Sequence, residues 1–174
     1  HSALAANTTG ASNVAVGAYS LDANTTGANN TAVGLHAMGA NSIGHSNVGV
    51  GRNALAANTT GINNVAVGHL ALDAATTAAG NTALGSEALS ADTLGGRNTA
   101  IGYQTLATQN FTSATNVYNV AVGYNSGYAV TTGTQNTLIG GLAGDAITTA
   151  SNNTALGYLA LSANTTGSVN TAIG

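Results

Sequence analysis

The stretch Asn153-Thr-Ala-Leu-Gly157 carries the pattern on which the fold of this chain depends, and nine similar copies accompany it. Each copy begins with Asn, continues with Thr or Val, usually Ala, and Val, Ile or Leu, and ends with Gly. The copies recur every 17 residues, apart from one interval of 21, which indicates a repeat architecture. The residues that bound the copies are Asn13 and Gly17, Asn30 and Gly34, Asn47 and Gly51, Asn64 and Gly68, Asn81 and Gly85, Asn98 and Gly102, Asn119 and Gly123, Asn136 and Gly140, Asn153 and Gly157, and Asn170 and Gly174.

Each repeat predicts one coil of a β-solenoid. The motif alternates in the manner of a strand, and a second apolar position follows four residues after its glycine, as at Leu21 and Leu72. Two strands of about five residues and two short turns then fill one repeat, with the motif glycine in a turn. Helical repeats are excluded because they need about 33 residues or more per unit.

Stacked coils predict an all-β parallel solenoid of about ten coils. Strand spacing of about 4.8 Å gives a rod about 45 Å long, and residues 1–174 form one domain. We expect a core ladder of Val, Ile and Leu from the motif, and a ladder of asparagines whose amides bond along the rod. The chain starts within a coil and ends on a complete motif, so we expect a fragment of a longer fibre.

A column of small residues occupies the middle of the motif. We expect these side chains to face outward, opposite the core ladder, where small residues allow copies of the chain to pack closely. The alternative is a plain exposed surface that binds nothing. The column that predicts self-association consists of Ala15, Ala32, Ala66, Ala83, Ala100, Ala121, Ala155 and Ala172, with Gly49 and Leu138 at the two remaining positions.

Composition and charge exclude several classes of function. The chain has two arginines, five acidic residues and a net charge of −3, so it lacks the basic surface that nucleic acids and anionic membranes require. It has no cysteine, and therefore no disulfide or thiolate chemistry. No apolar run approaches the roughly 20 residues of a membrane-spanning helix, and residues 1–12 show neither the basic nor the apolar region of a signal peptide.

No pattern of reactive residues predicts catalysis, a metal or a cofactor. Asp22, Asp73 and Asp145 share a coil position but lie on coils that are not adjacent. Glu87, Asp92 and Arg97 lie close in the sequence, and we expect a weak surface ion pair there. The histidines His36, His45 and His69 occupy three different coil positions without partners at ligand spacing, so we expect solvated imidazoles.

The 21-residue interval predicts an insertion loop within residues 107–118. Insertions in solenoids often mark binding faces. Most of the aromatic residues gather around this loop, and two of them occupy equivalent positions on neighbouring coils. The candidate ligand-binding residues are Tyr103, Phe111, Tyr118, Tyr124 and Tyr128. They either bind a sugar or receptor, or simply cover the apolar core beside the loop.

The repeat resembles a known family. Asn119-Val-Ala-Val-Gly123 and Asn170-Thr-Ala-Ile-Gly174 are similar to the repeat of YadA-like heads in trimeric autotransporter adhesins, and the unit Asn153 to Gly167 is similar to repeats of phage and bacterial tail-fibre proteins. The resemblance implies a left-handed β-roll, a side-by-side homotrimer, and an extracellular place on a bacterial surface or a virion tail fibre. Its 17-residue period is longer than the usual coil of the adhesin family.

Two functions follow as expectations. The first is a structural and adhesive fibre segment, without catalysis, cofactor or metal, that associates with itself and attaches to a host-cell receptor or glycan. The second is an ice-binding solenoid, because Thr-Thr pairs such as Thr25-Thr26 and Thr59-Thr60 recur at one coil position. Adjacent strand residues point to opposite faces, so only one threonine of each pair should face outward. A catalytic solenoid is less favoured, because it needs a charged groove.

Overall fold

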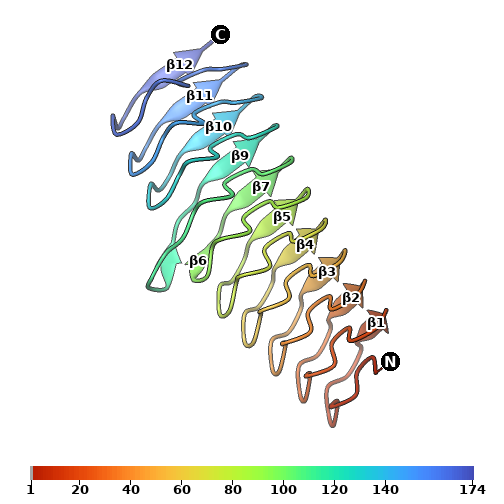
Figure 1. Cartoon of the computed structure of the whole chain (residues 1–174). Helices are drawn as coiled ribbons and strands as arrows, with labels where there is room; N and C mark the ends of the chain where they lie inside the picture. The colour runs from red at the N-terminus through yellow and green to blue at the C-terminus, as the bar shows by residue number, and fades with distance from the viewer. Residues whose placement is uncertain (1) are drawn as a thin grey trace.

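In the computed structural model, which describes residues 2–174, the chain is an all-β parallel solenoid of about nine turns. The coils stack into a rod with the two termini at opposite ends (Figure 1). The ten-stranded parallel sheet consists of β1 (Val14–Val16), β2 (Thr31–Val33), β3 (Val48–Val50), β4 (Val65–Val67), β5 (Thr82–Leu84), β7 (Thr99–Ile101), β9 (Val120–Val122), β10 (Thr137–Ile139), β11 (Thr154–Leu156) and β12 (Thr171–Ile173). A two-stranded parallel sheet pairs β6 (Gly95–Gly96) with β8 (Thr115–Asn116).

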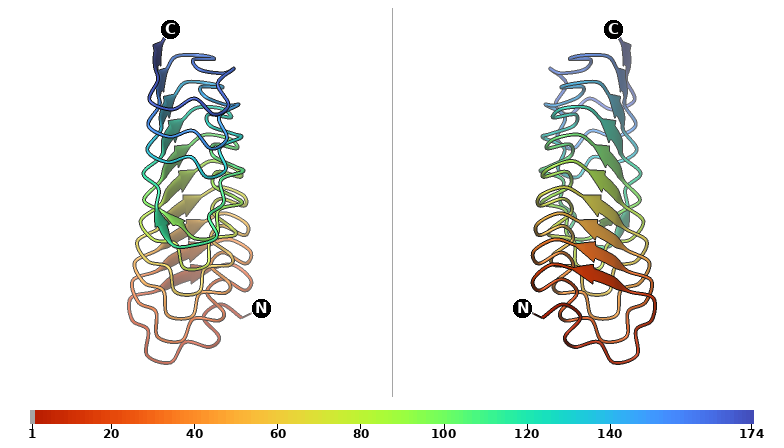
Figure 2. Two further views of the ribbon diagram at one scale, coloured as in Figure 1. Left: turned by 90° about the vertical axis from the view of Figure 1, so that its left-hand side faces the viewer. Right: turned by 90° about the vertical axis from the view of Figure 1, so that its right-hand side faces the viewer.

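Each motif strand pairs with the equivalent strand of the next coil. Val14 pairs with Thr31 and Ala15 with Ala32, and the register continues without a slip through the 21-residue coil, where Ala100 pairs with Ala121. Both side views in Figure 2 show the strands stacked one above another along the rod. The predicted solenoid and its 17-residue repeat are therefore confirmed. No helix within residues 2–174 is long and apolar enough to cross a membrane.

The expected second strand of each coil is absent from the regular repeats. The segment after the motif glycine takes left-handed backbone at two positions, as at Leu70 (φ 55°) and Leu72 (φ 51°). A positive φ costs an L-residue roughly 1–2 kcal/mol and cannot continue a strand. Only the second of the two residues is buried in the core, and its burial offsets about 1.5–3 kcal/mol of this cost. The segment forms a series of turns that brings one large apolar side chain, a leucine or Met38, into the core of each regular coil.

The interior of each regular coil holds one large apolar side chain. The fully buried large apolar side chains of the regular coils follow the motif glycine by four residues, and small alanines surround them. This ladder consists of Leu21, Met38, Leu55, Leu72, Leu89 and Leu106. The second apolar position of the repeat is thus confirmed as core, whereas the Val, Ile and Leu residues at the first and third positions of the motif strands are not part of it.

Two coils fill the same narrow core differently. Glycine replaces the core leucine at Gly127 and Gly144, and a Cβ added to either would come 2.8 Å from a methyl carbon of Leu138. Leu138 stands where other coils have alanine, and Val130 and Ile147 add further buried volume. Large and small residues have exchanged positions, and the volume of the core is conserved.

A ladder of buried asparagines runs through the motif, as predicted. The Asn30 backbone N–H donates to Asn13 Oδ1 at 2.9 Å, and Asn30 Nδ2 donates to the Gly44 carbonyl at 2.8 Å. Asn47 Nδ2 in turn donates to Asn30 Oδ1 at 3.3 Å. Each amide therefore joins the motif to the turn 14 residues later in the same repeat, and it also links the asparagines of neighbouring coils. Because the amides are buried, these bonds are lost only at a high cost in desolvation.

A second asparagine ladder covers only the first coils. Asn41 Nδ2 donates to Asn24 Oδ1 at 2.8 Å, and Asn58 Nδ2 donates to Asn41 Oδ1 at 2.7 Å. The next coil has Ala75 at this position, and the buried Asn58 Oδ1 has no hydrogen-bond partner within residues 2–174. Asp92 occupies the position one coil further on. The composition of this ladder therefore changes in the middle of the rod.

Candidate functional site

Two ranks of side chains cover the outward face of the ten-stranded sheet. The first residue of each strand is Thr or Val, and the third is Val, Ile or Leu. In the middle of the rod Leu84 remains 45% exposed and Ile139 37% exposed. No strand residue on this face is charged. The result is an uncharged surface with one continuous aliphatic rank along the length of the sheet, and apolar surfaces of this kind commonly mark interaction sites.

The predicted orientation of the motif strands is wrong. The alanine column faces the interior, and Ala32, Ala66, Ala83, Ala100, Ala121 and Ala155 are fully buried within their own chain. Ala15 and Ala172, in the terminal coils, are partly buried and pack against the same core. Leu138 is also fully buried. The alanine column therefore cannot form a surface between copies, and the Thr/Val and Val/Ile/Leu ranks are the outward ones.

The reason for this orientation is the width of the coil. The core leucine of each coil reaches across to the motif strand, and little room remains beneath it. At Gly49, a Cβ would come 2.8 Å from Cγ of Met38, so even alanine is too large where the facing side chain is methionine. Small residues in the motif are required by packing inside the chain.

The five candidate aromatic residues do not form one site. Tyr103 and Tyr124 follow two motif glycines, and their rings stack at 5.7 Å between centroids. Tyr118 precedes Asn119, at the other end of β9, and Phe111 is buried. Tyr128 is exposed, and it lies two residues before the buried Val130 in the coil that follows β9. The buried ring of Phe111 is not available on the surface beside the exposed tyrosines.

The threonine pairs use one of their two hydroxyls inside the rod. Thr25 Oγ1 donates to the Ser42 carbonyl at 3.1 Å, and Thr59 Oγ1 donates to the Thr76 carbonyl at 3.1 Å. The second threonine of each pair, as at Thr26 and Thr60, is exposed. Between Thr25 and Thr149 one threonine of each pair faces outward, as expected, although these residues lie in bends and not in a strand. In the first and last pairs, Thr8-Thr9 and Thr165-Thr166, both threonines are exposed.

The expected ion pair of Arg97 is not formed within residues 2–174. Glu87 accepts a hydrogen bond from Gln104 Nε2 at 2.7 Å, and Asp92 accepts one from Gln109 Nε2 at 2.6 Å. Arg97 Nε instead donates to Asn116 Oδ1 at 3.0 Å. The acidic groups have amide partners, and the guanidinium is left without a carboxylate.

Asp92 lies in the core of the insertion region. Its Oδ1 accepts the Gly95 N–H at 2.9 Å, and its side chain is fully buried. Burial raises the pKa of the Asp92 carboxyl above its ordinary value, against the opposing effect of hydrogen bonds from Gln109 and Gly95. Burial likewise raises the pKa of Asp73. Neither carboxyl has a second titratable group at hydrogen-bonding distance, so neither forms an acid/base pair.

Replacement of Asp92 by Asn should reduce the dependence of stability on pH. With a raised folded-state pKa, the folded chain binds a proton more readily than the unfolded chain, so this carboxyl lowers stability as the pH rises above its ordinary pKa. We expect Asp92→Asn to reduce the gain in stability between pH 7 and pH 4, and to give no gain at pH 7, because both carboxylate oxygens accept from N–H groups and the new amide would place a donor against one of them. Urea denaturation at pH 4 and pH 7 measures both effects. Asp22→Asn controls for the change in net charge, and an equal reduction of the pH dependence in it would contradict the explanation.

No cluster of three or more His, Cys, Asp or Glu side chains in residues 2–174 is arranged to hold a metal ion. His36 stacks on Tyr19, with ring centroids 4.8 Å apart, and His45 Nδ1 lies 3.4 Å from Ser46 Oγ. These imidazoles thus contact neighbours on the surface of the rod.

No family model, curated protein or solved structure matches the chain.

Proposed function

We propose that the chain is a structural, non-catalytic segment of an extracellular attachment fibre, in which copies lie side by side along the rod axis. The observation that carries this proposal is the outward face of the ten-stranded sheet. Its third-position rank is aliphatic in every strand, from Val16 in β1 to Ile173 in β12. An aliphatic surface of this length is costly to leave in water, and contact with another surface removes that cost.

The partner that best fits the face is a second copy of the same chain. The side chains on the face repeat at the strand spacing of about 4.8 Å, so a parallel copy meets it with the same spacing at every coil. A globular partner would match this spacing at a few coils only. The absence of charge from the face removes the like-charge repulsion that otherwise opposes self-association.

The number of copies and the setting follow from the resemblance. YadA-like adhesin heads and tail-fibre repeats imply three chains around one axis, displayed on a bacterial surface or a virion tail. We propose the same arrangement here, with the outward sheet face, rather than the alanine column, between the chains. The attachment target is a receptor or glycan on a host cell. The continuous hydrogen-bond ladders support this role, because a stiff rod extends a binding site away from its anchor.

Ice binding through the threonine pairs has less support. The first threonine of a pair donates its hydroxyl hydrogen bond to a backbone carbonyl of the next coil, as Thr25 does to the Ser42 carbonyl. The exposed threonine rank is interrupted by Ile43 and Leu94. A regular hydroxyl array is therefore incomplete on that side of the rod.

Charged substitutions on the sheet face test the proposal. Val65→Glu with Val67→Glu places two carboxylates in the middle of the face, and we expect sedimentation velocity to show dissociation to a chain of 16.7 kDa. Both positions are at least partly exposed in the single chain, so the coil itself should lose little stability, about 0.5 kcal/mol per site.

The matched control carries the same added charge elsewhere. Thr26→Glu with Thr60→Glu changes two exposed residues outside the sheet, and this variant should sediment like the wild-type chain. Circular dichroism checks that both variants remain folded. Association that survives the sheet-face substitutions, or that is lost equally in the control, would show that the face does not join the copies.

A further inference from the structure

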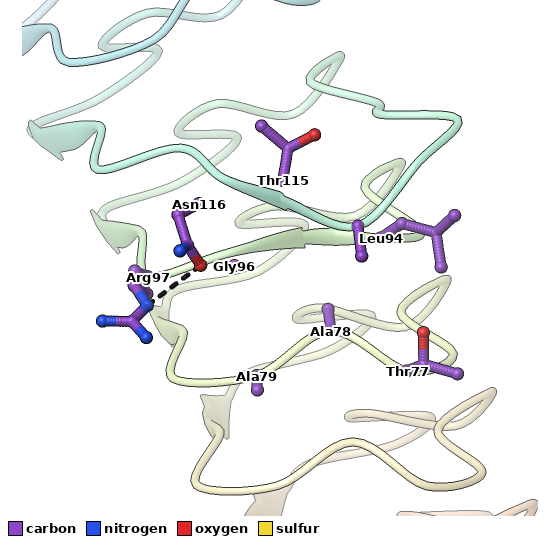
Figure 3. A pocket seen from close by; sticks show the side chains of 9 residues that line it. Thr77, Ala78, Ala79, Leu94, Gly96, Arg97, Thr115 and Asn116 are labelled. Carbon is purple, nitrogen blue, oxygen red and sulfur yellow. Dashed lines mark hydrogen bonds between the residues drawn. The ribbon is translucent and has the colours of Figure 1, made fainter.

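A small cavity lies beside the insertion loop. Its volume is about 210 Å³, and no residue of the ten-stranded sheet lines it. Figure 3 shows Arg97 and Asn116 at one end and Leu94 and Thr77 at the other. Drug-sized ligands occupy pockets of about 300–1,000 Å³, so this cavity fits a group of roughly one sugar ring.

The insertion creates the cavity. In the 21-residue coil the chain leaves the path of its neighbours and returns through β8, whose Asn116 pairs with Gly96 of β6. Ala114 and Thr115 form the wall on this side, and Ala78 and Ala79 of the coil below form the floor. A Cβ on Gly96 would come 2.8 Å from the Ala79 carbonyl oxygen, so the floor is closed at that point. Regular coils lack the overhanging wall.

The cation at the end of the cavity is held in place. Arg97 Nε donates to Asn116 Oδ1 at 3.0 Å, and the guanidinium carbon lies 5.7 Å from the centroid of the Tyr118 ring. These contacts restrict the side chain, which lowers the entropy cost of binding a ligand to it.

The terminal nitrogens of the same guanidinium remain available. Nε is occupied by Asn116, and no carboxylate of residues 2–174 forms an ion pair with Arg97. The free end of the guanidinium has the geometry that binds a carboxylate through two parallel hydrogen bonds. Arg97 is one of two arginines in a chain of net charge −3, so an exposed cation in a cavity is exceptional here.

The lining indicates which anion fits. Phosphate sites gather several N–H donors or cations, and this cavity offers one arginine. The floor of alanine and glycine suits the C–H face of a ring, and Thr77 and Asn116 supply polar groups at the rim. The negative net charge of the chain disfavours densely charged polyanions. A ring with a single carboxylate combines these properties.

We infer that this cavity binds the carboxylate-bearing sugar of an acidic glycan, with the carboxylate on Arg97 and the ring over Ala78 and Ala79. The inference deepens the proposed attachment function, on which it rests for the source of the ligand. It gives the insertion loop a role that the regular coils do not have.

Titration with glucuronic acid tests the inference. We expect saturable binding in the millimolar range, followed by amide chemical shifts that concentrate at Gly96, Thr115 and Asn116, and at least tenfold weaker binding of neutral glucose. Arg97→Gln should weaken the binding of glucuronic acid at least tenfold. Arg52→Gln is the matched control, because Arg52 is exposed and does not line the cavity, and it should bind within twofold of the wild-type chain.

Several results would overturn the inference. These are the absence of saturable binding up to about 50 mM, equal affinity for glucose and glucuronic acid, unchanged affinity in Arg97→Gln, or inorganic phosphate that binds as tightly as the uronate. The sedimentation of each sample separates this inference from the proposed function. Arg97→Gln should leave the association of copies unchanged, and loss of association with retained uronate binding would contradict the fibre proposal alone.

Discussion

Gly68→Ala is expected to disrupt the stacking of coils and to lower the free energy of unfolding by at least about 3 kcal/mol. Gly68 has a φ of 137°, a backbone conformation that side-chain-bearing L-residues rarely adopt. A Cβ there would also come 2.5 Å from the Gly85 carbonyl oxygen and 2.6 Å from its carbon. Both atoms belong to the backbone of the next coil, so the clash is relieved only if the coils separate. Thermal and urea denaturation at a fixed chain concentration measure the loss.

Gly39→Ala is the control for this substitution. Gly39 does not have a positive φ, and the nearest atoms to its added Cβ are 3.4 Å away, an ordinary contact. We expect a change between zero and a gain of about 1 kcal/mol, because alanine reduces the entropy of the unfolded chain. Equal losses in the two variants would contradict the explanation, since they would show that the loss does not depend on the positive φ of Gly68 or on its contact with the next coil.

Asn64→Ala is the second substitution with a large expected effect, a loss of about 2–5 kcal/mol. Asn64 Nδ2 donates to the Ala78 carbonyl at 2.8 Å, and Asn64 Oδ1 accepts the Asn81 N–H at 3.0 Å. Alanine would leave that carbonyl and that N–H without partners in a buried part of the rod. Each unsatisfied group costs about 1–3 kcal/mol.

The adjacent asparagine provides the control for the ladder. Asn63 is exposed and has a φ of 57°, so Asn63→Gly should change stability by about 0.5 kcal/mol or less. Hydrogen exchange adds a local measurement, because Asn64→Ala should raise the exchange rate of the Asn81 amide in particular. Retained protection of that amide would show that another acceptor replaces Asn64 Oδ1, and the ladder would then contribute less than proposed.

The repeat and its stacking were predictable from sequence. A strict period places equivalent residues above one another, and the in-register pairs Val14 with Thr31 and Ala15 with Ala32 follow from that period alone. The asparagine ladder was predictable for the same reason, because a side chain with one donor group and one acceptor group bonds well to copies of itself. The single interval of 21 residues marks the coil in which the chain returns beside β6 through β8.

The inward face of the strands was predicted wrongly. Alternation separates the two faces of a strand, but it does not say which one is buried. The expectation relied on size, since Val and Leu are usually buried more often than Ala. Here the core leucine of each coil leaves space for little more than a methyl group, so Ala66 is buried while Val65 is 37% exposed. Threonine at the first strand position in several coils was the available signal that this face is outward.

The cavity and the absence of a second strand depend on local geometry that the pattern does not contain. The sequence places Tyr118 and Arg97 one coil apart, but the contact of Arg97 with Asn116 exists only because the insertion returns beside β6. Positive φ values at leucines such as Leu72 are also unexpected from residue type. In both cases tertiary packing overrides the local preference.

The mass of the wild-type chain in solution is the most direct test of the central claim, that the outward sheet face joins copies of this chain in a fibre. Light scattering coupled to size exclusion, at two concentrations tenfold apart, gives this mass without any substitution. The account predicts a mass three times that of the 16.7 kDa chain at both concentrations. A mass of one chain at both concentrations would contradict it, because the aliphatic ranks would then face water.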